Sequence, residues 1–241
     1  MAEPLLWADM KSEFKERIQP LLPEGGNLDL CMTCGTCAGG CPATDLAGMN
    51  PRKFLRMALL GLDEEILNTP WIWMCSLCGR CKAACPMDID IPGMVTQARA
   101  SWERDKRPSG IRRSCDLAVT QETHSSMGAN EEDWRFVVED VAEEVRAEQP
   151  GFDKLLAPMD KKGAYFFLNQ NSREPVTEPD EMVPLWKILD EASADWTYGS
   201  KGWAAENYCL FLADMPNWEK IVREKARAVD ELGCKVWLNT E

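Results

Sequence analysis

Two cysteine runs of identical spacing constrain this chain more than any other feature of its sequence. Each run has the form C-x2-C-x2-C-x3-C-P. The first run contains Cys31, Cys34, Cys37 and Cys41, and the second contains Cys75, Cys78, Cys81 and Cys85. Together they account for eight of the eleven cysteines. Clusters this tight indicate metal binding rather than disulfide cross-linking.

The spacing is typical of ligands to two [4Fe–4S] clusters. Each cluster needs four thiolates, one for each iron, and a tight loop can aim three of them at one cluster. The fourth cysteine of such a run ligates the other cluster in two-cluster ferredoxins. We therefore predict two clusters with exchanged fourth ligands. The first takes Cys31, Cys34, Cys37 and Cys85, and the second takes Cys75, Cys78, Cys81 and Cys41.

Other uses of these cysteines fit the pattern less well. Zinc sites commonly use C-x2-C pairs, so two complete runs would leave surplus thiols. A cluster with a purely structural role is a better alternative. One cluster would be enough to cross-link a fold, however, whereas two form a path for electrons. The doubled run therefore favours electron transfer.

The charge of the chain limits its partners. The net charge is −13 and the isoelectric point is about 4.7, whereas nucleic-acid binding needs a basic surface. We therefore expect no nucleic-acid partner. A few basic residues nevertheless surround the cysteine runs: Arg52, Lys53, Arg56, Arg80 and Lys82. They either balance the negative clusters or bind an acidic electron-donor partner.

The sequence also bears on location. No apolar segment reaches the roughly 18 residues of a membrane-spanning helix, and residues 1–14 lack the basic and apolar regions of a signal peptide. The expected location is the cytoplasm.

The residue pattern divides the chain into four segments. They are a helical leader at 1–26, a helical ferredoxin-type domain at 27–107, a helical connector at 108–160 and an α/β segment at 161–241. The leader is predicted to pack on its own domain, with docking to a partner as the alternative. Asn50 and Pro51 suit the N-cap and first position of a helix between the runs. Residues 93–105 and 131–148 are predicted to form further helices.

The last segment alternates strand and helix signals. Residues 164–168 and 235–239 are predicted strands, and 182–191 is a predicted helix. A second helix is expected between Asp214 and Gly233, which suit its two ends. This order indicates an α/β layer. The expected fold class is mainly α with an α/β C-terminal part.

Residues 27–107 resemble the helical ferredoxin domain of heterodisulfide reductase C subunits, because two such runs are separated by a helical segment. The iron–sulfur subunits of succinate and glycerol-3-phosphate dehydrogenases are more distant relatives. The stretch from Asp195 to Cys209, DWTYGSKGWAAENYC, is similar to the HmcF, TmcB and DsrK proteins of sulfate-reducer membrane complexes, which are related to heterodisulfide reductase D. That family joins a helical ferredoxin domain to a cysteine-rich CCG domain.

The resemblance implies partners and a place in the cell. It implies a cytoplasmic subunit at the inner face of the membrane, bound to a membrane cytochrome or quinone-type subunit and to other iron–sulfur subunits. A cytoplasmic thiol or disulfide substrate is a further implication for some members. In the family the CCG segment carries several cysteines, whereas here it departs from the pattern, with Tyr208-Cys209 in place of a Cys-Cys pair.

Cys209 is therefore the candidate for a further site, either as a ligand or as a redox thiol. The other thiols of that site would lie beyond Glu241, where the natural protein is expected to continue. A third cluster is possible in such a longer chain. Cys115 and Cys234 are expected to be buried apolar residues, and His124 to have no redox role. Three functions stay open: an electron-transfer subunit, a thiol–disulfide reductase, and the iron–sulfur subunit of a flavin dehydrogenase. No nucleotide-binding motif is present in the sequence.

Overall fold

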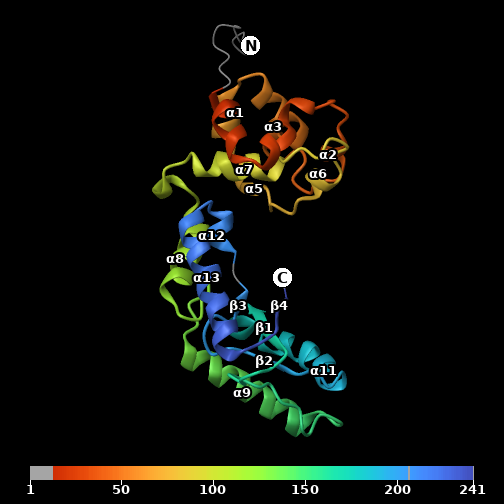
Figure 1. Cartoon of the computed structure of the whole chain (residues 1–241), viewed down its shortest axis with the longest axis vertical. Coiled ribbons are helices and arrows are strands. Elements are labelled where there is room, and N and C mark those ends of the chain that lie inside the picture. Colours follow the sequence, from red (N-terminus) through yellow and green to blue (C-terminus); the bar gives the residue numbers. More distant parts are fainter. Residues whose placement is uncertain (1–12, 206, 241) are drawn as a thin grey trace. The chain divides into compact units, whose positions relative to one another are not determined.

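The computed structural model describes residues 13–205 and 207–240 of the chain. These residues form two compact units, with the boundary between Pro108 and Ser109. The first unit is coloured red to yellow in Figure 1, and the second is coloured green to blue.

The described part of the first unit is built from helices, with no strand. Its α-helices are α1 (Glu13–Ile18), α2 (Thr36–Gly39), α3 (Pro51–Leu59), α4 (Asp63–Asn68), α5 (Trp71–Met74), α6 (Arg80–Ala83) and α7 (Ile91–Ala100). Short 3-10 helices are η2 (Gln19–Leu21), η3 (Pro23–Leu30), η4 (Leu46–Gly48) and η5 (Arg104–Lys106). Helices thus separate the two cysteine runs, as predicted. The helix predicted at 93–105 begins two residues earlier and ends at Ala100.

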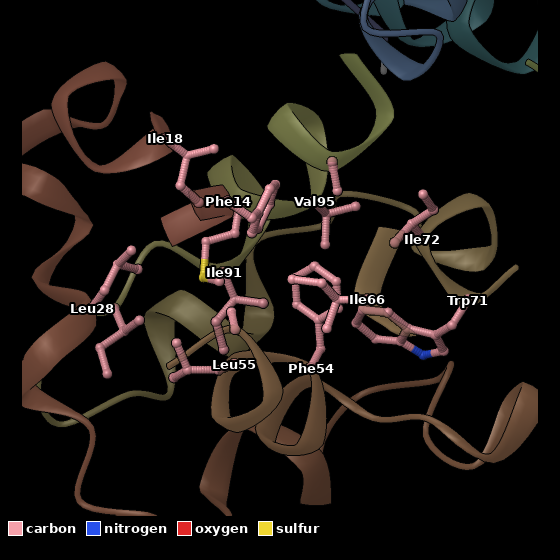
Figure 2. Packing of buried hydrophobic residues seen from close by; sticks show 14 of the residues in the cluster. Phe14, Ile18, Leu28, Phe54, Leu55, Ile66, Trp71, Ile72, Ile91 and Val95 are labelled. Carbon is pink, nitrogen blue, oxygen red and sulfur yellow. The ribbon is translucent and has the colours of Figure 1, made fainter. Parts of the chain in front are cut away.

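The core of this unit holds the cysteine runs in place. Figure 2 shows Phe54 of α3 beside Trp71 of α5, and their ring centroids lie 5.4 Å apart. The indole nitrogen Nε1 of Trp71 donates to the carbonyl of Ala43, just after the first run, at 2.8 Å. At the start of α3, the side chain of Asn50 accepts from the backbone N–H of Lys53, which confirms the predicted N-cap.

The predicted leader is only partly described, because residues 1–12 lie outside the described residues. Its described portion packs into the same core. Phe14 and Ile18 are each 1% exposed and lie against the helices around the cysteine runs. This segment packs on its own domain, which is the first of the two interpretations.

The second unit combines helices with a small sheet. Its helices are α8 (Ser109–Thr120), α9 (Glu131–Glu148), α10 (Glu174–Thr177), η6 (Pro179–Met182), α11 (Val183–Glu191), α12 (Tyr208–Phe211) and α13 (Met215–Leu232). Its strands are β1 (Phe166–Asn171), β2 (Trp196–Thr197), β3 (Ala204–Ala205) and β4 (Val236–Asn239). Strand β1 pairs in parallel with each of the other three strands. The predicted α/β character of this region is confirmed.

Parallel pairing of β1 with β4 requires a long crossover connection, and the chain between these two strands supplies one that contains helices. The register pairs Phe166 with Val236 and Asn169 with Asn239. Helix α13, which leads into β4, begins after Asp214, whose side chain accepts from the backbone N–H of Asn217. It ends at Gly233, where the left-handed φ of 69° suits glycine. Both predicted helix ends are confirmed.

Residues 109–160, which make up all but the first residue of the connector predicted at 108–160, belong to the second unit. Trp134 of α9 is fully buried and stacks on Trp203 with ring centroids 4.0 Å apart. Its Nε1 donates to the carbonyl of Gly199 at 3.1 Å. The apolar stripe of α9 therefore covers the region that follows β2 and contributes to the core of this unit.

Within the part of the chain that the structure describes, no helix has both the length and the apolar composition needed to cross a bilayer.

Candidate iron–sulfur sites

Two cavities in the first unit are each lined by four of the run cysteines. Cys31, Cys34, Cys37 and Cys85 line one cavity, which we call the first cavity. Cys41, Cys75, Cys78 and Cys81 line the other, which we call the second cavity. Each cavity therefore combines three thiols of one run with the last thiol of the other run.

The two runs adopt the same backbone conformation where they turn. Thr33 and Leu77, each just before the second cysteine of its run, have φ values of 60° and 57°. Gly35 and Gly79, each just after that cysteine, have φ values of 86° and 75°. A short helix then follows in each run, α2 or α6. The positive φ at Gly35 and Gly79 favours glycine at both positions, because glycine has no Cβ to clash there.

The thiols of each cavity influence one another. Burial raises the pKa of Cys37, and the neighbouring thiols of Cys85 and Cys31 raise it further. Burial also raises the pKa of Cys81 to about 12, with a contribution from Cys75. Protons are therefore held on these sulfurs until a cation replaces them.

One thiol differs from the others. The hydroxyl of Thr36, 3.4 Å from the Cys34 sulfur, is the main cause that lowers the pKa of Cys34. Cys34 and its counterpart Cys78 are exposed, whereas the other six run cysteines are half-buried.

The donor set fits iron–sulfur clusters. All eight run cysteines are free thiols, and soft thiolate ligands in sets of four are what these clusters require. When bound, the clusters accept and release single electrons. The residues of the chain supply the thiolates, the turns that aim them and the charges around them.

Arginines lie next to both runs. Arg52 lines the first cavity and approaches Gly35. Arg80 lines the second cavity and lies across Gly40, where an added Cβ would be 2.7 Å from its Nε. Arg99 is a third arginine, which donates to the carbonyl of Cys75. Sequence reasoning missed Arg99, although its position four residues after Val95 on a helix places it on the buried face of α7.

Other members of the predicted basic group have local roles. The Lys53 side chain donates to the carbonyl of Gly48 at 2.9 Å. Lys82 lies 3.8 Å from the carboxylate of Asp90.

Cys209, the candidate for a further site, forms a disulfide with Cys115 in the second unit. Their Cα atoms are 4.8 Å apart, and the bond joins α8 to α12. The prediction for Cys115 needs correction: it is buried, but it has a covalent partner. Cys234 is half-buried rather than buried. The spacing of Cys115 and Cys209 gave no signal for this pair, because 94 positions separate them.

His124 belongs to the second unit, whereas the run cysteines belong to the first. It is 3% exposed, its Nδ1 lies 3.0 Å from the carbonyl of Ala118, and its Nε2 lies 3.3 Å from Glu224. Burial lowers the pKa of His124, and the carboxylate of Glu224 opposes that shift. It lines a charged cavity of about 400 Å³.

Comparison with known proteins identifies the region around the runs. Residues 30–90 match the family model described as a 4Fe-4S dicluster domain. The C subunit of the H(2):CoB-CoM heterodisulfide,ferredoxin reductase of Methanothermobacter marburgensis is 36% identical over 91 residues, which are 38% of this chain and 48% of that protein. The iron-sulfur C subunit of the CoB--CoM heterodisulfide reductase of Methanopyrus kandleri is 33% identical over 93 residues, again 38% and 48% of the two chains.

A third relative has the same extent of similarity. The C subunit of the ferredoxin/F(420)H(2)-dependent CoB-CoM heterodisulfide reductase of Methanosarcina acetivorans is 33% identical over 85 residues, which are 35% of this chain and 52% of that protein. The chain thus spans about half the length of the relatives it matches. Residues 30–90 form a 4Fe-4S dicluster domain similar to that of heterodisulfide reductase C subunits, and a domain of this kind carries two [4Fe–4S] clusters.

Proposed function

We propose that this chain transfers single electrons through two [4Fe–4S] clusters as the iron–sulfur subunit of a membrane-bound, heterodisulfide-reductase-like complex. One observation carries the proposal: the eight thiols line two cavities, and each cavity combines three thiols of one run with the last thiol of the other run. Such sharing holds two clusters in one core, as a path for electrons requires. A domain that used iron only as a cross-link would be served by a single cluster.

The ligand sets that we propose are the four thiols of each cavity. Protein purified without oxygen should then contain about eight irons per chain, four for each cluster. Zinc in place of iron, or an iron content near two, would refute the proposal. Cys234→Ser is a suitable control, because this half-buried thiol lies in the second unit and outside both cavities.

A crossed pair of variants tests the exchanged ligands. Cys41→Ser should damage the cluster of the second run, and Cys85→Ser should damage that of the first run. Cys34→Ser and Cys78→Ser provide the reference spectra. Cys34→Ser should damage only the cluster of the first run, and Cys78→Ser only the cluster of the second run. Electron paramagnetic resonance of the reduced protein compares the four variants. If Cys41→Ser matches Cys34→Ser, the ligands are not exchanged.

The complex and its partners are proposed from the relatives, whose names describe subunits of larger reductases. We propose a membrane-bound cytochrome or quinone-type subunit and other iron–sulfur subunits as partners, at the inner face of the cytoplasmic membrane. After cell fractionation the chain should sediment with membranes, and deletion of the integral partner should release it. A chain found free in the soluble fraction while that partner is present would contradict this part of the proposal.

Residues 161–241 are proposed as the N-terminal part of a CCG-type domain, supported by the parallel strands of the second unit and the helices between them. A disulfide-reductase activity is less well supported. Cys115 is 0% exposed and Cys209 is 1% exposed, and thiol–disulfide exchange requires access of a thiolate to sulfur. Because Cys209 lines neither cavity, Cys209→Ser should leave the iron content unchanged. A loss of iron would make Cys209 a ligand after all.

A further inference from the structure

Arg99 places a cation inside the first unit. It lies on α7 among the buried side chains of Ile91, Met94, Val95 and Ala98 and is itself only 1% exposed. The guanidinium group of arginine keeps its proton far above neutral pH. At neutral pH the group therefore stays charged in a site from which water is largely excluded.

The contacts of Arg99 aim this charge at the second run. Nε donates to the carbonyl of Ile72 at 2.8 Å, and Nη2 donates to the carbonyl of Cys75. The guanidinium carbon lies 5.3 Å from the centroid of the Trp73 ring. These contacts fix the cation beside the first cysteine of the second run.

The surroundings of the first run differ at the corresponding helix. In α3, the helix that follows the first run, the buried residues are Pro51, Phe54, Leu55 and Ala58, all of them apolar. Leu55 lines the first cavity. The exposed arginines, in contrast, are matched, because Arg52 lines the first cavity and Arg80 lines the second. Arg99 thus distinguishes the second run from the first.

We propose that Arg99 holds the cluster of the second run at a higher reduction potential than the cluster of the first run. In the reduction step each [4Fe–4S]2+ gains one electron and becomes [4Fe–4S]+, and no bond forms or breaks. A fixed positive charge stabilises the added negative charge, most strongly where the dielectric constant is low. An electron that enters either cluster therefore settles on the cluster of the second run. This inference rests on the proposed function and deepens it.

The unmodified protein provides the first test. An anaerobic redox titration uses dithionite as the reductant and electron paramagnetic resonance as the readout, and it should show two reduction steps. Cys78→Ser should alter or remove the step at higher potential, and Cys34→Ser the step at lower potential. A single shared step, or the reverse assignment, would overturn the inference. Low iron content would instead refute the proposed function, so the two failures are distinguishable.

Variants of Arg99 test the cause. Arg99→Gln should lower the higher midpoint potential and leave the lower one unchanged, whereas Arg99→Lys should retain most of the wild-type value because it retains the charge. Arg80→Gln and Arg52→Gln are matched surface controls, each expected to shift only its own cluster and by less, since water screens exposed charges. An unchanged higher midpoint in an iron-replete Arg99→Gln protein would reject the role of Arg99. If that variant binds no iron, the order of the two steps in the wild-type protein still decides the proposal.

Discussion

Reduction of the Cys115–Cys209 disulfide should destabilise the second unit and leave the stability of the first unit unchanged. The bond joins two helices that share a small apolar cluster with Ala118, Leu212 and Ile221. Reduction breaks only the S–S bond, after which the two thiols move apart to van der Waals distance, while the other side chains of the cluster stay packed. The principal change is therefore in the unfolded chain, which is released from a closed loop.

The size of the effect follows from the length of that loop. The two cysteines are separated by 94 positions. In the chain-entropy account, closing a loop of this length stabilises the folded state by about 4 to 5 kcal/mol. Because 1.4 kcal/mol corresponds to a factor of ten, reduction should raise the unfolded fraction of this unit by roughly three orders of magnitude. That is a large share of the roughly 5–15 kcal/mol that stabilises a typical domain.

Hydrogen exchange read by mass spectrometry measures this effect for each unit separately. Peptides from α9 and β1 should lose protection after prolonged treatment with a phosphine reductant, which reaches the buried bond when the unit opens transiently. Peptides from α3 and α7 should not lose protection. A Cys115→Ala/Cys209→Ala protein should show the loss without reductant and no further response to it. Cys234→Ala serves as the control. The reasoning is refuted if the free energy of unfolding falls by less than about 1 kcal/mol, well under the loop-entropy value. It is also refuted if the untreated protein yields no cross-linked peptide.

Three further predictions follow from particular contacts. Gly40→Ala should displace Arg80 and lower the midpoint potential of the second-run cluster, whereas Gly39→Ala, with no atom within 4 Å of the added Cβ, should not change it in the same titration. Trp71→Ala should lower the free energy of unfolding of the first unit by about 3–5 kcal/mol, because a fully buried ring is removed. Urea unfolding followed by the absorbance of the clusters measures this change. Burial holds the pKa of His124 below its ordinary 6.5, so the unfolded chain binds more protons at this residue than the folded chain. The free energy of unfolding of the second unit should therefore fall as the pH drops through 6.5. His124→Gln should flatten this part of the pH dependence measured by hydrogen exchange.

Features with a local cause could be predicted from the sequence. Asn50 caps α3 and Asp214 caps α13 because their side chains bond to backbone N–H groups only three residues away. Gly233 ends α13 because the required φ is unfavourable for other residues. The apolar period of α9 marks its extent from Glu131 to Glu148. In each case the decisive contacts lie within one turn of helix.

Features that depend on distant contacts could not be predicted. Cys115 and Cys209 meet only because α8 and α12 pack together, and neither local sequence indicates that packing. The strands β2 and β3 are two residues long, too short for an alternating pattern, and they form only because β1 lies beside them. Arg99 carries a partial signal, since helical spacing puts it on the buried face of α7. Its contact with Cys75 depends on how α7 meets the second run.

The two cavities also link metal binding to the fold of the first unit. Cys41 lies in the cavity with the second run and Cys85 in the cavity with the first run. If these thiols bind iron as proposed, neither run can complete its cluster until the segment between them has folded. That segment includes Phe54 and Trp71, which pack together in the same core. Because an unfolded chain offers no such site, cluster binding contributes directly to folding free energy, and loss of either cluster should loosen both runs.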